Sequence, residues 1–148
     1  MSFPSFTESG DLPAGVHRAD LSETLARFGT GSRQRRLVAL RLHRIYRLAR
    51  ATGKLRRFVV FGSFVTREPE PKDVDLFLLM EDTFDVAELS GESRLLFEHT
   101  TAQAHFGASV FWLRRLAALG GEQNTIEYWQ MKRDGSYRGI VEIIPESQ

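Results

Sequence analysis

The sequence predicts an α/β fold: a small mixed sheet of about four strands with helices packed on it. Two short apolar runs, residues 58–61 and 76–80, are each bounded by turn-forming or charged residues. Such runs are typical of strands that are covered on both faces. Residues 33–51 instead repeat apolar positions at helical spacing, which predicts an amphipathic helix. A chain of 148 residues with 42% hydrophobic content is long enough to bury one core.

The N-terminal residues 1–18 are polar and contain prolines and glycines, so we expect an extended arm. Residues 19–148 then form a single domain. Its first helix begins at a capping box, in which Asp20 is followed three residues later by Glu23. Gly29 is the expected C-terminal stop of this helix.

The second helix is predicted over residues 33–51, with Ser32 as its N-cap. Its buried face carries Val38, Leu42, Ile45 and Ala49. Arg41, Arg44 and Arg47 follow another side of the helix. We interpret these arginines first as a solvated face, and as an alternative they bind a polyanion such as RNA.

The first apolar strand ends at a turn formed by Gly62 and Ser63. Glycine allows a sharp turn and the close approach of another group to its backbone. Ser63 is placed to cap a short helix over residues 64–67, and free N–H groups at a helix start favour phosphate. This stretch therefore predicts a phosphate-binding turn.

The second apolar strand begins at two acidic residues, Asp73 and Asp75. Successive strand side chains alternate between the two faces, so both carboxylates lie on one face and Val74 lies on the other. Carboxylate oxygens beside a phosphate-binding turn are suited to Mg²⁺ bound together with a nucleotide.

The rest of the chain supplies further elements of the same kind. We expect a helix over residues 92–99 or beyond, a strand over 107–112, a helix over 122–131 and a final strand over 138–144. These elements complete a four-stranded sheet with helices.

The central motif resembles a known family. Gly62 and Ser63, the spacer, and the alternating run of residues 73–76 are similar to the signature of the DNA polymerase β-type nucleotidyltransferase superfamily, which includes small bacterial minimal nucleotidyltransferases. Residues 12–17 and 133–141 also resemble an uncharacterised bacterial group of nucleotidyltransferase-like proteins. The resemblance implies that Gly62 and Ser63 bind the phosphates of a nucleoside triphosphate. It implies that the two aspartates of the run are catalytic and hold Mg²⁺.

The sequence departs from this family at the third acidic residue, which the family places on a neighbouring strand. Strand order matches that position to Ser109, and residues 107–111 contain no Asp or Glu. Glu142 and Glu98 are the candidates to replace it in space. Among the four histidines, His105 is the one we expect to border the site.

The resemblance implies transfer of a nucleoside monophosphate, most simply AMP from ATP, to a protein or RNA hydroxyl with Mg²⁺. It also implies a place in a bacterial toxin–antitoxin pair. The alternative is a catalytically degenerate fold that acts as a nucleotide-binding or antitoxin-like module. Ser109 favours this alternative, whereas the intact motif favours the enzyme. RNA binding through the arginine-rich helix is a third hypothesis.

The composition and charge of the chain limit the classes of protein to which it can belong. The chain has no cysteine, which excludes disulfides and thiolate chemistry, and a net charge of +1. Ten of the 20 basic residues lie within 33–57, and ten of the 19 acidic residues lie within 68–98. The chain has no apolar run long enough to cross a membrane and no secretory pattern at its start, so we expect a cytoplasmic protein without membrane contact.

Overall fold

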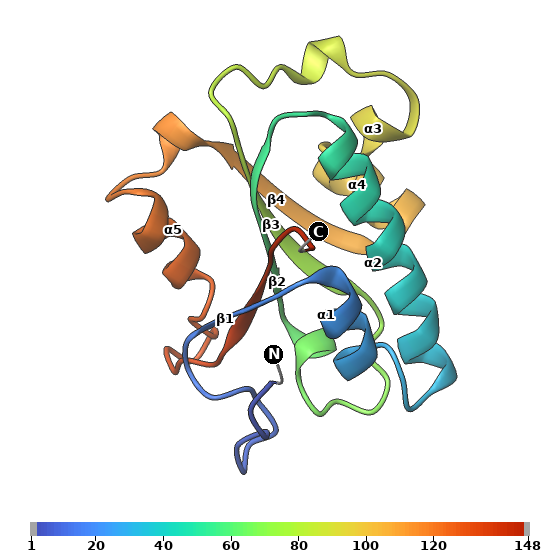
Figure 1. Ribbon diagram of the computed structural model, residues 1–148, viewed down its shortest axis with the longest axis vertical. Helices are drawn as coiled ribbons and strands as arrows, with labels where there is room; N and C mark the ends of the chain where they lie inside the picture. The colour runs from blue at the N-terminus through green and yellow to red at the C-terminus, as the bar shows by residue number, and fades with distance from the viewer. Residues whose placement is uncertain (1–2, 147–148) are drawn as a thin grey trace.

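The computed structural model describes residues 3–146 and confirms the α/β class. Its sheet has five strands in the order β1-β5-β2-β3-β4, one more than expected (Figure 1). The strands are β1 (Val16–Ala19), β2 (Leu55–Phe61), β3 (Val74–Met80), β4 (Ala108–Arg114) and β5 (Ile140–Ile143). β1 is parallel to β5 and β3 to β4, whereas β2 is antiparallel to both of its neighbours. The sheet is therefore mixed, as predicted.

The α-helices are α1 (Leu21–Phe28), α2 (Arg33–Ala51), α3 (Gly91–Leu96), α4 (His99–Phe106) and α5 (Glu122–Tyr128). The capping box of α1 is confirmed, because the Asp20 carboxylate accepts from the Glu23 N–H at 2.8 Å. Ser32 caps α2 as expected. The helix expected from residue 92 is instead divided into α3 and α4. Within residues 3–146 no helix is long and apolar enough to cross a membrane.

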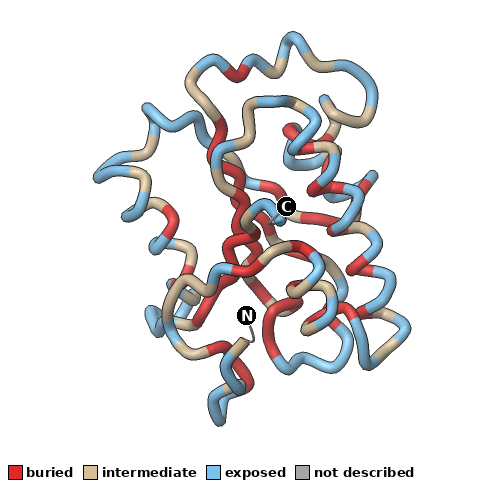
Figure 2. Tube along the Cα trace, in the orientation of Figure 1, coloured by how far each residue is buried: buried red, intermediate tan, exposed pale blue. Residues whose placement is uncertain are grey.

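The two faces of the sheet are covered very differently. Helices α1 to α4 lie on one face, which we call the helix face, and α5 lies on the other, the open face (Figure 1). Alternation along β3 directs Leu76 and Leu78 into the larger core under the helix face, and Phe77 and Leu79 into a small cluster with Ile126 of α5. Buried residues are concentrated along the central strands (Figure 2). The domain therefore has one large core and one small one.

The expected N-terminal arm is part of the packed structure. Leu12 is 1% exposed, and its carbonyl accepts a hydrogen bond from the Gly139 N–H at 2.9 Å. The Gly10 carbonyl accepts one from the Arg67 N–H at 2.8 Å. The end of the arm enters the sheet as β1, an edge strand that was not anticipated because Val16–Ala19 contains only two apolar residues. The segment before the first helix thus contacts two distant parts of the chain: the turn after β2, through Gly10, and the start of β5, through Leu12.

The last strand is shorter than predicted. Residues 131 and 137 form an isolated antiparallel bridge, and β5 begins only at Ile140. We call the segment 130–139 the basic hairpin, because it carries Lys132, Arg133 and Arg138. It is closed by a hydrogen bond from the Lys132 N–H to the Ser136 carbonyl at 2.8 Å.

Candidate functional site

The strand directions bring the predicted motif residues to one edge of the sheet. The end of β2 meets the beginnings of β3 and β4, so that Phe61, Asp75 and Ser109 occupy neighbouring register positions on three adjacent strands. Strand alternation places Asp75 on the open face, opposite Val74 and Leu76 in the large core. Ser109 thus lies directly beside Asp75, at the position where the resemblance expects a third acid.

The Gly62 turn is built around the Asp75 carboxylate. Gly62 has φ of 81° and ψ of −164°, a conformation that is essentially restricted to glycine. A Cβ atom at this position would lie 2.0 Å from Oδ2 of Asp75. Gly62 therefore satisfies both a backbone and a space requirement, and it holds the turn against the carboxylate.

The prediction that Ser63 caps a helix is wrong. The turn continues as a single 3₁₀ turn, Ser63–Val65, with Gly62 in the cap position and no side-chain cap. This three-residue turn stands in place of the helix that was expected over residues 64–67. In the described part of the chain the Ser63 hydroxyl makes no hydrogen bond, so it is available to a ligand.

Asp75 has the most perturbed electrostatics of the site. Burial raises the pKa of Asp75 from 3.8 to about 6, and the charge of Asp73 adds to this rise. A hydrogen bond from Ser109 and the positive charge of Arg138 act in the opposite direction on that pKa. Asp73 itself lies just before β3 and affects Asp75 through its charge. Desolvated, mutually repelling carboxylates are a common feature of functional sites, because a cation relieves both penalties.

Asp75 and Ser109 open into a cavity of about 660 Å³ on the open face. Aromatic rings form one wall of this cavity, which we call the aromatic wall: Phe61, His99, Phe111 and Trp129. The ring centroid of Trp129 lies 4.7 Å from that of Phe61 and 5.3 Å from that of Phe111. Phe111 is 40% exposed, so a flat apolar surface remains accessible within the cavity.

The basic hairpin also lines the cavity, through Lys132, Arg133, Asp134 and Arg138. Arg138 also lines a second cavity of about 340 Å³, which contains Ser63 and Asp11. The sequence allowed Arg138 to line the cleft but favoured a hairpin role for it, and it gave no sign that Lys132 and Arg133 would lie there. These residues are more than 50 positions from Asp75 in the chain, so their approach is visible only in the fold.

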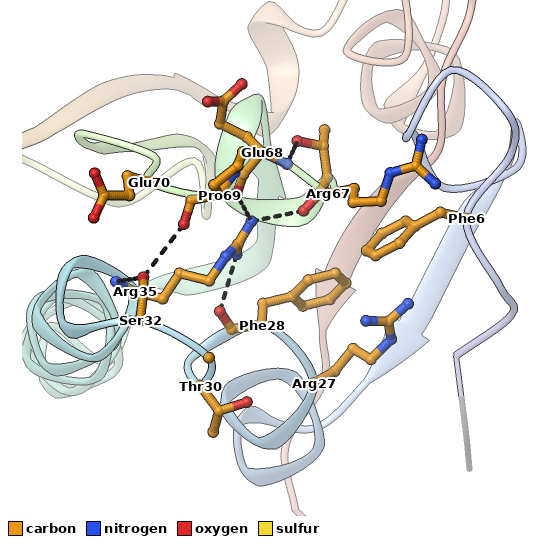
Figure 3. Close-up of a pocket in the computed structure, with 12 residues that line it drawn as sticks. Phe6, Arg27, Phe28, Thr30, Ser32, Arg35, Arg67, Glu68, Pro69 and Glu70 are labelled. Carbon is orange, nitrogen blue, oxygen red and sulfur yellow. Dashed lines mark hydrogen bonds between the residues drawn. The ribbon is translucent and has the colours of Figure 1, made fainter.

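The loop after the turn is fixed by a buried arginine. Arg35 of α2 is 8% exposed, and Figure 3 shows its guanidinium among backbone carbonyls rather than in solvent. It donates hydrogen bonds to the carbonyls of Phe28, Phe64, Thr66 and Glu68. The sequence predicts no separate role for Arg35 among the basic residues of 33–57. The sequence signal for its burial is spacing: Arg35 precedes Val38 by three residues and Leu42 by seven, so all three lie on the same face of α2.

The two proposed replacements for the third acid lie elsewhere. Glu142 is 3% exposed and forms an ion pair with Arg57 at 2.7 Å on the other side of α5, because it neighbours Val59 in the register. Glu98 forms an ion pair with Arg94 at 3.4 Å, at the start of α4. Neither residue lines the cavity that contains Asp75. Ser109 therefore has no acidic substitute from these two residues.

The histidine expectation was also wrong. His105 points to Glu92, at 2.8 Å, on the helix side of β4. His99, at the first position of α4, lines the cavity instead and stacks near Phe111 at 5.0 Å between ring centroids. Both histidines belong to α4, and the orientation of this helix directs His99 rather than His105 into the cavity.

The oxygen donors of the site determine whether it fits Mg²⁺. Among residues 3–146 no three His, Cys, Asp or Glu side chains are grouped as a metal site. Asp73, Asp75 and the Ser109 hydroxyl offer hard oxygen ligands, and Mg²⁺ in proteins commonly uses one or two carboxylates with water and substrate phosphates for the remainder. The residues present therefore fit one Mg²⁺ shared with a phosphate ligand.

A comparison with protein families places the chain. The family model described as "Family of unknown function (DUF6932)" matches residues 4–144. The chain belongs to this family. The match spans the sheet, the turn and the basic hairpin together, so this DUF6932 domain extends over nearly the whole chain. No curated protein and no solved structure matches it.

Proposed function

We propose that this DUF6932 protein is a Mg²⁺-dependent nucleotidyltransferase that transfers a nucleoside monophosphate, most simply AMP from ATP. The observation that carries the proposal is the contact of the Gly62 turn with the Asp75 carboxylate. It joins a turn with an available hydroxyl, Ser63, to the desolvated carboxylate of Asp75, on which the charge of Asp73 acts. Such an arrangement has oxygen ligands for a cation on one side and donors for phosphate on the other.

Each residue has a separate task in the proposed reaction. Gly62 and Ser63 bind phosphate oxygens, and Asp73 and Asp75 hold Mg²⁺, which stabilises the charge of the in-line displacement when bound. The acceptor oxygen forms a bond to the α-phosphorus as the bond to the pyrophosphate breaks, and the acceptor proton passes to solvent. The aromatic wall offers a stacking surface to the base.

The open face favours a macromolecular acceptor. The cavity is lined by strand ends, by two residues of α4 and by the basic hairpin, and Phe111 in its wall is 40% exposed, so a large acceptor can approach it. A protein or RNA hydroxyl is the acceptor that we propose, and a toxin–antitoxin partner is the form of it that the family resemblance suggests. We propose a cytoplasmic location, because ATP is abundant there.

A second candidate function rests on Ser109. Its hydroxyl accepts from the Gln103 amide at 3.2 Å beside Asp75, where the resemblance expects a carboxylate. An amide and a hydroxyl bind a nucleotide without activating an attacking oxygen. The alternative is therefore a nucleotide-binding module that recognises a partner and does not catalyse transfer.

Calorimetric titration of ATP, with and without Mg²⁺, tests the proposal. We expect Mg²⁺-dependent binding by the native protein and its loss in Asp73→Asn/Asp75→Asn. Glu88→Gln is the matched control, because Glu88 is an exposed carboxylate far from the cavity. Transfer of label from α-labelled ATP to protein or RNA then separates the enzyme from the binding module. Absence of ATP binding by the native protein would contradict both functions.

A further inference from the structure

We propose that the basic hairpin is the triphosphate clamp of this site, with Arg138 and Arg133 as its phosphate-contacting residues. This inference rests on the proposed function and assigns it residues outside the aspartate motif. It predicts a ligand class: nucleotides with a polyphosphate chain bind, and nucleoside monophosphates bind poorly.

Arg138 lies between two cavities, the one that contains Asp75 and the one that contains Ser63, and it lines both. A ligand that contacts the carboxylates through a cation and the Ser63 hydroxyl directly must pass this guanidinium. The positive charge of Arg138 already acts on Asp75 across the cavity.

The basic hairpin carries more basic than acidic side chains. Lys132 and Arg138 share a single carboxylate, that of Asp11, at 3.3 and 3.8 Å. Arg133 forms no ion pair within residues 3–146. The remaining acid of the hairpin, Asp134, accepts hydrogen bonds from Ser136 within the turn. The hairpin thus brings three cations and one carboxylate, Asp134, to the cavity, where Asp75 is a second acid, and Arg133 has no ion pair in the described structure that would compete with an anionic ligand.

The Arg138 N–H donates to the Gln130 carbonyl at 2.9 Å, next to the Gly139 hydrogen bond to the N-terminal segment. Gln130 is 8% exposed, and its side-chain carbonyl accepts from the Gly15 N–H at 2.6 Å. The backbone on which Arg138 stands is therefore fixed before a ligand arrives. Preorganised guanidinium groups bind phosphate with a smaller entropic cost than mobile lysines.

The position, charge and rigidity of the basic hairpin together favour a polyphosphate over a monophosphate. One phosphate group is served by Gly62, Ser63 and a cation on the aspartates. Phosphates beyond it need further donors in the cavity, and charge-assisted bonds from arginine to phosphate are among the strongest that side chains make. Without the hairpin, the two aspartates would repel the outer phosphates.

The test compares Arg138→Ala and Arg133→Ala with the native protein, using calorimetry in Mg²⁺. ATP, AMP and inorganic tripolyphosphate are the probes. We expect the affinity for ATP and tripolyphosphate to fall about tenfold or more in Arg138→Ala, because a charge-assisted hydrogen bond is lost. The affinity for AMP should change less than about threefold on the same scale. Arg138→Lys should restore part of the loss.

Arg47→Ala is the matched control, because Arg47 is an exposed arginine on α2 and lines none of the cavities described above. Arg133→Ala guards against a folding defect, since this exposed side chain has no ion pair to lose in the described structure. Thermal unfolding of each variant checks the fold.

The outcomes separate the clamp from the proposed function. If the native protein binds ATP and both hairpin variants keep its preference for ATP over AMP, the clamp is wrong and the function stands. If the variants lose binding of a single-stranded RNA oligonucleotide but retain ATP, the hairpin contacts the phosphates of an acceptor, which also overturns the clamp. If the native protein binds neither ATP nor tripolyphosphate, the proposed function fails and the clamp fails with it.

Discussion

The two faces of the sheet divide stability from chemistry. The helix face is covered by four helices, and its strand residues Leu76 and Leu78 are 0% exposed. On the open face α5 covers a small cluster, and Phe111 and Leu113 of strand β4 are 40% and 37% exposed. Both faces are formed by the same strands, one residue apart. A single strand can therefore support a large core while its alternate residues remain free for a ligand.

Strand β3 shows the difference between the two faces of the sheet most clearly. Val74, Leu76 and Leu78 contribute to the large core, whereas Asp75 turns a carboxylate to the open face at the strand's beginning. A charged group at the centre of the helix face would be buried without water or a partner, at a cost of several kcal/mol. Placing it at the edge of the thinly covered face makes that cost smaller and gives a ligand access.

The largest expected effect comes from truncating a leucine on each face. Leu78→Ala should lower the free energy of unfolding by about 2–5 kcal/mol, because it leaves a cavity in the large core. Leu113→Ala should lower it by less than about 1 kcal/mol, because this side chain is partly solvated. Urea denaturation of the two variants measures both values. A similar loss of unfolding free energy in the two variants would show that the open face contributes as much to stability as the helix face does.

A smaller effect is expected at the Gly62 turn, which follows β2. Gly62→Ala should cost about 1–3 kcal/mol of stability, from the positive φ and from the collision with Asp75. In an Asp75→Ala background the collision is absent, so the same substitution should cost less. A double-mutant cycle by chemical denaturation measures the difference. Equal costs in the two backgrounds would mean that the turn does not depend on the carboxylate.

The smallest effect is the pH dependence of Asp75. Its folded pKa of about 6 lies above the value of 3.8 for the exposed group, so the folded state binds the proton more tightly. The stabilising contribution of the protonated carboxyl is complete below pH 3.8 and is lost as the pH rises through 6. Asp75→Asn should therefore be more stable than the native protein at pH 7, by about 1–2 kcal/mol after allowance for partial solvation, and equal to it near pH 3.5.

Denaturant titrations of both proteins across this pH range provide the measurement, made without Mg²⁺. Asp73→Asn is the comparison variant, because it removes the repulsion and leaves Asp75 in place. A stability difference between Asp75→Asn and the native protein that does not change with pH would contradict the raised pKa.

Local patterns along the chain were sufficient to predict most elements of the fold. The capping box at Asp20, the Ser32 cap and the apolar runs of β2 and β3 depend on contacts within a few residues, which a sequence records directly. The same is true of the turn at Gly62. Strand β1 escaped prediction because its pairing with β5 joins residues 16–19 to 140–143, and no local pattern reports such a partner.

The candidate site shows the same division. Spacing and the family resemblance together predict Gly62, Ser63, Asp73 and Asp75 as one group, because a strand, a turn and a second strand are consecutive in the chain. Which other residues face that group depended on long-range packing: Arg138 and Lys132 reach the cavity through their contacts with Asp11, and His99 reaches it in place of His105. Local backbone geometry fixes the relative positions of side chains that are near each other in the chain. Residues that are distant in the chain come together only through the packing of the whole core.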